Sequence, residues 1–256
     1  MQPRFSIITI NYNGAALLEG TMESVRRQSY PYIEYWVIDG GSKDTSVEVI
    51  KQFAEQMPNL RWISERDKGL YDAMNKGLRL ATGDFVWFLN GGDHLHAPDT
   101  VEKLAAMARP QTGVLYGETL LVDDNRRPAG VMSELSTRTL PQQLCWRDYL
   151  GGMLVVHQSF VARRSLAPEY IMGNLCADYD WCIKILKQSE ENIHTGLILS
   201  DYLMGGMSKQ RHRQSLRDRF EVMREHFGLA ATFWAHVRIV FRAILHRFRR
   251  MGKPKY

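Results

Sequence analysis

Short apolar, β-branched runs recur along the first part of the chain, and a segment with helical spacing follows each of the first three. The runs predict strands over residues 5–10, 33–38, 60–64 and 85–89. The intervening segments predict helices over residues 15–29, 44–57 and 70–81. Such strict alternation predicts an α/β fold, an open and mostly parallel sheet with helices on both faces.

The second half of the chain has a less regular pattern. Short strands are expected over residues 114–116 and 119–122, and residues 137–150 are compatible with a helix. Further helices are expected over residues 178–187, 212–227 and 229–250. We therefore expect one α/β domain over residues 1–208 and a basic helical C-terminal extension with amphipathic helices over residues 209–256.

Each of the four predicted strands is followed by a polar cluster. The clusters are Asn11-Tyr12-Asn13, Asp39-Gly40-Gly41-Ser42, Glu65-Arg66-Asp67 and Asn90-Gly91-Gly92-Asp93. Parallel strands bring their carboxyl ends to one edge of the sheet, where ligands bind in open α/β folds. The pattern therefore predicts a ligand site built from all four clusters.

Two carboxylates stand out in these clusters. Asp39 is followed by two glycines, which would let a nucleotide approach the backbone while the carboxylate accepts hydrogen bonds from it. The alternative is a carboxylate that caps the next helix, for which Ser42 is the expected N-cap. Asp93 follows a buried strand in a Gly-Gly turn, where it is either a metal ligand or an ordinary turn aspartate.

Together these motifs resemble those of family 2 glycosyltransferases with the GT-A fold. The resemblance lies in residues 6–13, 37–44, 64–77 and 81–93, and it is closest to bacterial exopolysaccharide enzymes of the colanic-acid type. It extends over about residues 4–208. It implies a nucleotide-sugar donor, a divalent cation (Mg²⁺ or Mn²⁺), and a saccharide or polyprenyl-linked acceptor.

The resemblance also implies roles for individual positions. Residues expected to hold the nucleotide or the rest of the donor are Thr9, Asn11, Asp39, Gly41, Ser42, Asp67, Gly69, Asp72, Asn75, Asn90, Gly91 and Gly92. Asp93 would bind the metal. The family's metal motif is usually richer in aspartate, so Asn90 and Gly92 are departures that predict a cation dependent on the donor diphosphate.

A second acidic motif, Ala177-Asp178-Tyr179-Asp180-Trp181, resembles the one that carries the family's catalytic base. Asp178 is the first candidate and Asp180 the second, while the alternative for Asp178 is a charge at a helix N-terminus. His157 and Gln158 resemble the acceptor side, and Gly205-Gly206-Met207-Ser208 resembles a loop that closes over the diphosphate. A single displacement by such a base implies inversion at the anomeric carbon.

The expected function is an inverting glycosyltransferase of cell-surface polysaccharide biosynthesis. Two alternatives remain. A nucleotidyltransferase would need a glycine-rich basic loop after the first strand, which Asn11-Tyr12-Asn13-Gly14 does not provide. A non-catalytic protein that binds nucleotide sugars, or a scaffold, would explain the reduced metal motif.

The basic charge of the chain is concentrated in its tail. Residues 208–256 carry 13 Lys and Arg against 3 Asp and Glu, whereas the rest carries 20 against 25. Phe233, Val237, Val240, Phe241, Ile244, Leu245 and Phe248 fall on one side of the expected last helix, beside a stripe formed by Arg238, Arg242, His246 and Arg249. This pattern is typical of a helix on an anionic membrane, and the alternative is a helix packed on the domain. A nucleic-acid partner is not expected, because the body is acidic.

The chain carries no signal-peptide pattern and no uninterrupted apolar run of about 18 residues. Three cysteines without CxxC spacing are typical of free thiols in a reducing compartment. A cytoplasmic protein is therefore expected, held peripherally at the inner face of the bacterial cytoplasmic membrane.

Overall fold

A computed structural model describes residues 2–205 and 212–251, with side chains at every position in those ranges except 212, 240 and 242–251. The strands are β1 (Phe5–Asn11), β2 (Ile33–Asp39), β3 (Leu60–Ser64), β4 (Phe85–Phe88), β5 (His94–Leu95), β6 (Thr112–Val122), β7 (Pro128–Val131), β8 (Phe160–Arg163) and β9 (Glu191–Leu203). The α-helices are α1 (Ala15–Arg26), α2 (Ser46–Gln56), α3 (Leu70–Leu80), α4 (Thr100–Met107), α5 (Met132–Leu135), α6 (Ala177–Gln188), α8 (His212–Phe227) and α9 (Leu229–Met251). Three 3₁₀ turns complete the list: η1 (Trp146–Gly151), η2 (His157–Ser159) and η3 (Arg164–Leu166).

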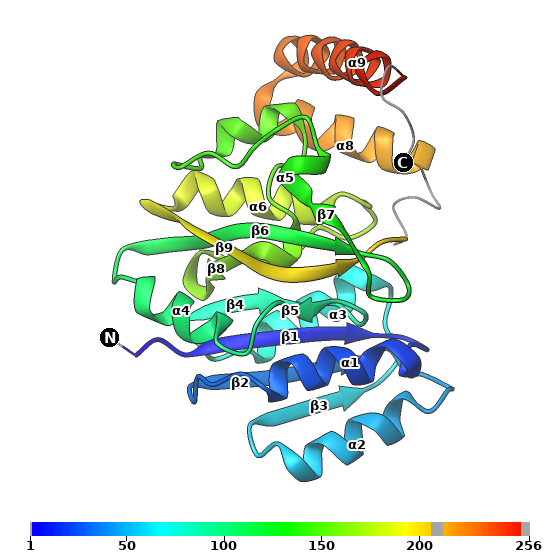
Figure 1. Cartoon of the computed structure of the whole chain (residues 1–256), viewed down its shortest axis with the longest axis vertical. Coiled ribbons are helices and arrows are strands. Elements are labelled where there is room, and N and C mark those ends of the chain that lie inside the picture. Colours follow the sequence, from blue (N-terminus) through cyan, green and yellow to red (C-terminus); the bar gives the residue numbers. More distant parts are fainter. Residues whose placement is uncertain (1, 206–211, 252–256) are drawn as a thin grey trace.

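The described strands form one mixed sheet in the order β3-β2-β1-β4-β8-β6-β9-β5, with β7 paired to β6. The first four strands in this order are parallel to one another, as are β6 and β9, while β8, β5 and β7 run antiparallel to their partners. The arrowheads of β1, β3, β6 and β9 point to the same side of the molecule, and α8 and α9 lie beyond α6, at the end of the molecule opposite β3 and α2 (Figure 1). The α/β class is confirmed, with helices on both faces of the sheet.

β1, β2 and β4 are buried on both faces, which explains their continuous apolar runs. In β1, Phe5 and Ile7 belong to one core cluster, together with Leu18 of α1. Ile8, which points to the other face, belongs to a second cluster that includes Met74 of α3. The sheet therefore separates two hydrophobic layers, and its polar groups are left at the strand ends.

The expected helix over residues 137–150 is wrong. Only the last part of this segment is helical, as the 3₁₀ turn η1. Pro141 lies inside the expected helix, where it removes a backbone donor and clashes with the preceding turn. The segment is instead held by Arg138, which donates to the carbonyl oxygens of Asp148 and Gly152.

Residues 114–116 and 119–122 belong to one long strand, β6, rather than to two. At Gly117 a Cβ atom would lie only 2.5 Å from the carbonyl oxygen of Leu197, so glycine permits the close approach of β9.

Ser42 is not the N-cap of α2, which begins at Ser46. Asp44 accepts hydrogen bonds from the backbone and hydroxyl of Ser46 instead.

Gly77 lets α3 lie close against β1. A Cβ atom at this position would lie 2.4 Å from Cγ2 of Ile8. Since the contact is with the side chain of a central strand, it fixes the depth of α3 on the sheet. The start of α3, which follows the third polar cluster, is thereby placed near the carboxyl ends of the strands.

We predict that Gly77→Ala lowers the free energy of unfolding by about 1–3 kcal/mol because of overpacking. An exposed helical glycine would show the opposite sign, since alanine favours helices by about 1 kcal/mol. Urea unfolding of Gly77→Ala in the wild-type and Ile8→Ala backgrounds measures this. The Ile8→Ala background should remove most of the loss, and a stabilising Gly77→Ala would contradict the packing account.

Candidate active site at the carboxyl edge of the sheet

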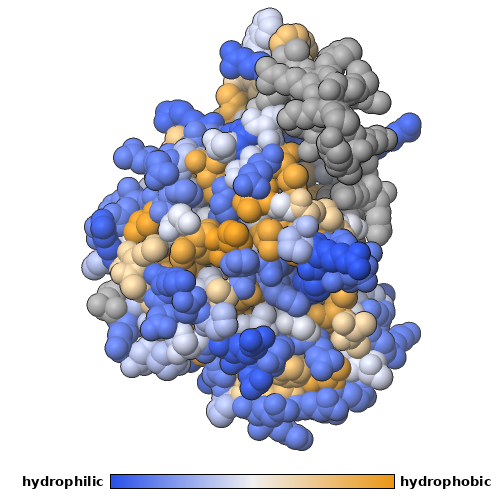
Figure 2. Space-filling view, viewed as in Figure 1, coloured by the Kyte–Doolittle hydropathy of each residue, from blue (hydrophilic) through white to orange (hydrophobic). Residues whose placement is uncertain are grey.

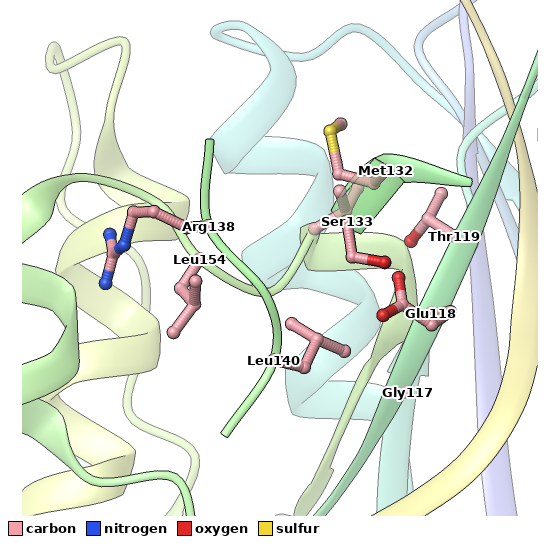
Figure 3. Close-up of a pocket in the computed structure, with 9 residues that line it drawn as sticks. Gly117, Glu118, Thr119, Met132, Ser133, Arg138, Leu140 and Leu154 are labelled. Carbon is pink, nitrogen blue, oxygen red and sulfur yellow. The ribbon is translucent and has the colours of Figure 1, made fainter. Parts of the chain in front are cut away.

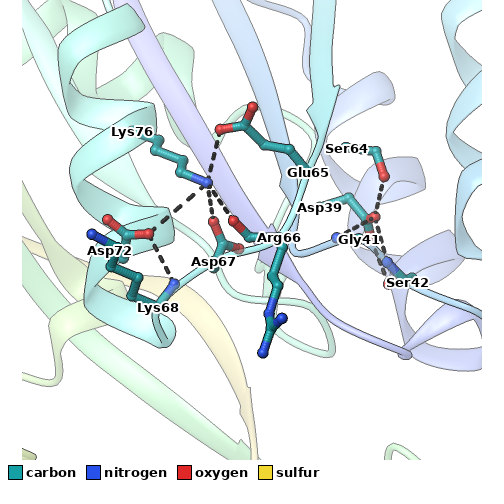
Figure 4. Close-up of polar contacts among 10 residues, drawn as sticks. All are labelled: Asp39, Gly41, Ser42, Ser64, Glu65, Arg66, Asp67, Lys68, Asp72 and Lys76. Carbon is teal, nitrogen blue, oxygen red and sulfur yellow. Dashed lines mark hydrogen bonds and ion pairs between the residues drawn. The ribbon is translucent and has the colours of Figure 1, made fainter.

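Asp39 lies fully buried at the end of β2 and accepts hydrogen bonds from three strand ends. Its Oδ1 accepts from Asn11 Nδ2 at 2.8 Å and from Ser42 Oγ at 2.5 Å. Its Oδ2 accepts from the backbone of Ser42 at 2.9 Å, the backbone of Gly41 at 3.2 Å and Ser64 Oγ at 2.6 Å. Figure 4 shows the contacts with Ser42, Gly41 and Ser64 converging on this carboxylate. Asp39 therefore organises the turns after β1, β2 and β3.

The hydrogen bonds determine the ionisation of Asp39. Burial alone would raise the pKa of this carboxyl, but the donors on Ser42, Ser64 and Asn11 hold it below its ordinary value. A carboxylate has about four lone-pair sites, and five donors already occupy them. A ligand can therefore reach Asp39 only by exchange with a hydroxyl such as that of Ser42.

Gly40 lies beneath Asp67 and Tyr12 and leaves no room there for a side chain of its own. A Cβ atom on Gly40 would lie 2.8 Å from Asp67 Oδ2 and 3.2 Å from Cδ2 of Tyr12, whose ring is 66 % exposed. Lys76 Nζ lies 2.6 Å from Asp67 Oδ1 and 2.8 Å from Glu65 Oε1, at the centre of the acidic cluster in Figure 4. Burial raises the pKa of Asp67 despite this lysine. An exposed ring and a carboxylate thus flank backbone that carries no side chain.

The start of α3 contributes backbone groups rather than free side chains. Gly69 has a φ of 118°, which other residues rarely adopt, and Asp72 accepts a hydrogen bond from the backbone of Lys68 at 2.9 Å. The amide of Asn75 donates to the carbonyl oxygen of Tyr170 and accepts from its N–H at 2.7 Å. Asn75 therefore pins the segment before α6 onto α3.

Two expected site residues point into the interior. Thr9 is fully buried, and its hydroxyl lies 3.0 Å from Tyr35 Oη. His157 is 4 % exposed, stacks on Phe88 and lies 2.8 Å from Tyr170 Oη through Nε2. Burial lowers the pKa of His157 to about 4, so it stays neutral. The structure does not bring either side chain to the surface of the edge.

Asp93 lies at the end of the fourth polar cluster and is only 4 % exposed. Its Oδ1 accepts from the backbone of Leu203 at 3.0 Å, and its Oδ2 accepts from Gln158 Nε2 at 2.9 Å. Burial raises the pKa of Asp93 to about 7, which the two donors and Arg126 only partly offset. Asn90 Oδ1 is buried and has no hydrogen-bond partner within residues 2–205 and 212–251.

The two glycines of this cluster hold its backbone in place. Gly91 donates to the carbonyl oxygen of Ile10 at 3.1 Å, and Gly92 donates to Thr21 Oγ1 at 2.9 Å. Gly92 has a φ of 104°, a conformation that favours glycine. The cluster is therefore anchored to β1 and α1, and Asn90 and Asp93 flank an ordered turn.

The donor set at this turn fits a cation only in part. In the part of the chain that the structure describes, no three His, Cys, Asp or Glu side chains gather as metal ligands. One carboxylate, Asp93, and one orphaned amide oxygen, on Asn90, are available. Magnesium sites in proteins commonly combine one or two carboxylates with substrate phosphates. Asp93 and Asn90 therefore fit a cation that is bound jointly by the protein and substrate phosphates. They do not fit a metal site formed by protein ligands alone.

Asp178 lies in the first turn of α6. Its Oδ1 accepts from the backbone of Tyr179 at 2.9 Å and from the hydroxyl of Tyr71 at 3.3 Å. Burial raises the pKa of Asp178, and these donors oppose the shift. Burial and then the charges of Asp93 and Asp178 raise the pKa of the Tyr202 hydroxyl on β9, so both carboxylates lie within electrostatic range of Tyr202.

Asp180 points away from this edge. It is 1 % exposed and forms ion pairs with His226 Nε2 and Lys184 Nζ, both at 2.7 Å. Burial opposes ionisation, but these partners lower the pKa of Asp180. Asp180 therefore ties α6 to α8, and the structure separates it from Asp178. Of the expected closing loop, Gly206-Met207-Ser208 lies outside the described residues.

Several residues at the edge were not singled out from the sequence. Ser64 and Tyr71 lie within the motif of residues 64–77, which was a usable signal. Arg126 and Tyr202 carry no local signal. They reach the site only because β6 and β9 run parallel across the sheet, which brings distant segments together.

Comparison with known proteins places these motifs in a family. The family model described as glycosyl transferase family 2 matches residues 6–170. A curated relative from Mycobacterium tuberculosis, "PGL/p-HBAD biosynthesis glycosyltransferase", is 33 % identical over 192 residues, which cover 71 % of this chain and 69 % of the relative.

Two solved structures share the fold. Staphylococcus aureus TarS 1–349 in complex with UDP-GlcNAc matches 86 % of this chain with a TM-score of 0.65 and 19 % identity, and this chain spans 64 % of it. The mannosyltransferase PcManGT from Pyrobaculum calidifontis, in complex with GDP-Man and Mn²⁺, matches 100 % of this chain and 77 % of its own length, with a TM-score of 0.65 and 18 % identity.

We predict that Asp39→Asn lowers the free energy of unfolding at pH 7 by about 1–3 kcal/mol, because its buried donors lose a charged acceptor. The pKa of Asp39 is lower in the folded than in the unfolded state. Its contribution is therefore present above the unfolded pKa, about 3.9, and lost as the pH falls through the folded pKa.

Urea unfolding at several pH values measures this effect. The difference between wild type and Asp39→Asn should shrink below about pH 4. Asp124→Asn, at an exposed position in the turn after β6, is the control and should change stability little. A difference that stays constant at all pH values would contradict the role of the charge.

Proposed function

The chain belongs to glycosyl transferase family 2, and we propose that it is an inverting glycosyltransferase that moves a sugar from a nucleoside-diphosphate donor to a saccharide or lipid-linked saccharide. The observation that carries this proposal is that Asp39, Asp67 and Asp93 lie at or just after the carboxyl ends of the parallel strands β2, β3 and β4, while Asp178 is held by Tyr71 of α3. The reaction needs a surface that binds the nucleotide, polar groups that hold the diphosphate, and a catalytic base. This edge of the sheet has candidate residues for each.

The nucleoside is proposed to lie near Gly40. Tyr12 offers an exposed ring beside it, Asp67 offers a carboxylate oxygen, and Gly41 leaves the backbone accessible. Asp39 holds the turn beside this nucleoside in place through its hydrogen bonds with Asn11 and Ser42. Thr9 and Asn75 support this nucleotide-binding surface from the interior and do not contact the donor.

The diphosphate is proposed to lie at the turn of Asn90, Gly91, Gly92 and Asp93, near the start of α3 with Gly69 and Asp72. Asp93 and Asn90 would hold a Mg²⁺ or Mn²⁺ ion jointly with the diphosphate. When bound, such an ion neutralises charge on the leaving group. PcManGT, which shares the fold, is a complex with Mn²⁺ and GDP-Man, and this likeness supports the proposal.

Asp178 is proposed as the catalytic base. Burial raises its pKa, which strengthens it as a proton acceptor, while the hydroxyl of Tyr71 and the N–H of Tyr179 stabilise and orient the carboxylate. Asp178 takes the proton of the acceptor hydroxyl as that oxygen bonds to the anomeric carbon. The bond from this carbon to the diphosphate breaks on the opposite side, so the configuration inverts.

The acceptor is proposed to approach beside Gln158, which holds Asp93. A small pocket lies next to it, lined by Val156, Glu118 and Ser133 among others. Figure 3 shows Glu118 and Ser133 pointing toward one another at this pocket, whose volume of about 10 Å³ admits at most a single hydroxyl of the sugar. His157 supports this wall from the core. We infer a role in exopolysaccharide or other cell-surface polysaccharide biosynthesis.

We predict that Asp178→Asn lowers sugar transfer at least 100-fold while nucleotide binding is retained. Asp180→Asn makes the same change on the same helix, but it should lower the melting temperature and leave transfer by the folded protein within about threefold. Donor turnover with saccharide acceptors and thermal unfolding measure both variants. Turnover unaffected by Asp178→Asn would reject this base, and no turnover of any donor would favour the non-catalytic alternative.

The C-terminal segment docks onto the domain through α8. Asp218 accepts a hydrogen bond from the backbone of Leu175 at 2.8 Å, and His226 pairs with Asp180. The boundary that we propose at residue 208 therefore divides two parts in contact. Within the described residues, no helix has the length and apolar character to cross a bilayer.

One face of α9 is apolar and unpacked. Leu229, Phe233, Val237 and Phe241 recur at every fourth position, and they are 62 %, 57 %, 44 % and 63 % exposed. The face of the molecule shown in Figure 2 is mostly hydrophilic, with a hydrophobic band across its middle. Ala235 of the same helix is only 6 % exposed and belongs to the core, so α9 packs on the domain through another face.

We propose that these four exposed apolar residues of α9 contact the anionic inner face of the cytoplasmic membrane. Beside them, a groove of about 580 Å³ is lined by Trp234, Arg147 and Arg238, among others. Aromatic rings and arginines together are typical of helices that bind at the headgroup level. Nucleic acid is not proposed as a partner.

We predict that Phe233→Ser/Phe241→Ser reduces flotation with vesicles containing phosphatidylglycerol at least fivefold, because two exposed aromatic side chains no longer insert. Tyr32→Ser, an equally drastic change at a 44 % exposed position just before β2, is the control and should not change flotation. Equal binding of the double variant, or equal binding to neutral vesicles, would contradict the membrane proposal.

A further inference from the structure

Arg126 lies in the turn between β6 and β7 and holds an unusual backbone conformation. Its φ is 62°, in the left-handed region that arginine rarely occupies. The turn is closed by Asp123, which accepts a hydrogen bond from the N–H of Arg126 at 2.9 Å and donates its own N–H to Arg127. The conformation is therefore held in place by the turn.

This backbone sends the guanidinium of Arg126 beneath the hairpin to the fourth polar cluster. Nη2 donates to the carbonyl oxygen of Gly92 at 2.5 Å. Burial lowers the pKa of Arg126, and the charges of Asp93 and Asp201 oppose that shift, so both carboxylates lie near it. A positive charge is thus already present at the turn proposed for the diphosphate.

One donor group of Arg126 is left over. Nη1 is buried and has no hydrogen-bond partner in the described parts of the chain. A buried donor without a partner is unfavourable, and a guanidinium matches phosphate oxygens in shape and charge. The same turn has an orphaned acceptor on Asn90 and a single carboxylate on Asp93. The turn thus offers few ligands for a metal ion, and it already contains the positive charge of the Arg126 guanidinium.

We propose that Arg126 supplies part of the positive charge that holds the donor's diphosphate, so that nucleotide binding persists without a divalent cation. This inference rests on the proposed function, because it concerns the same turn. Arg126 acts on the leaving group by charge and hydrogen bonding in a partly buried setting, where such interactions are strong. A divalent cation then strengthens binding and is not indispensable for it.

The test is calorimetric titration of the full chain with UDP and with GDP, in EDTA and in saturating Mn²⁺. Wild type should bind one of them in EDTA. Arg126→Gln should weaken that binding about tenfold in EDTA and less than threefold in Mn²⁺, since the ion supplies the missing charge. Binding of uridine or guanosine, which have no phosphate, should not change.

Two further variants separate charge from structure. Arg126→Lys keeps the charge and should retain binding in EDTA within about threefold, which also keeps the test valid if Arg126→Gln folds poorly. Arg127→Gln removes a charge from the exposed neighbour in the same hairpin and should have no effect.

The inference is overturned if Arg126→Gln weakens binding equally in EDTA and Mn²⁺, or weakens nucleoside binding equally. Strict dependence of wild type on Mn²⁺ would also overturn it and would leave the proposed function intact. If neither nucleotide binds under either condition, the proposed function fails, and this inference fails with it.

Discussion

The site depends on the hydrogen bonds that stabilise the buried carboxylate of Asp39. An ionised group in the interior is unfavourable unless donors surround it, and here donors come from the ends of β1, β2 and β3. This one interaction therefore sets the positions of Asn11, Ser42 and Ser64 relative to each other. The turns that follow three parallel strands become a single rigid edge, on which a ligand platform can form.

The other half of the site depends on long-range packing. Asp93 is held by Gln158, which precedes β8, and by the backbone of Leu203 at the end of β9. Asp178 is oriented by Tyr71 of α3. Since these partners come from distant parts of the chain, the carboxylates are placed only when both halves of the sheet have formed. This explains how a reduced metal motif can still lie in a defined environment.

The sequence predicted the first half of the fold and the helices α6, α8 and α9 closely, and the strands of the second half poorly. The first four strands and three helices follow from simple periodicity, because each is buried and short connections join them. The polar clusters were also visible, since strand ends are local features. The saturation of Asp39, the burial of His157 and the pairing of Asp180 with α8 were not, because each depends on a partner distant in sequence, such as His226. Arg126 was missed because nothing near it in sequence marks the turn it reaches.

The most direct test of the account is a crystal structure of the chain with a nucleotide sugar that it binds. We expect the nucleobase to lie between Tyr12 and Asp67 and the diphosphate to lie at the turn of Asn90–Asp93. The anomeric carbon of the sugar should face Asp178. A nucleotide bound away from this edge, or a sugar whose anomeric carbon faces away from Asp178, would contradict it.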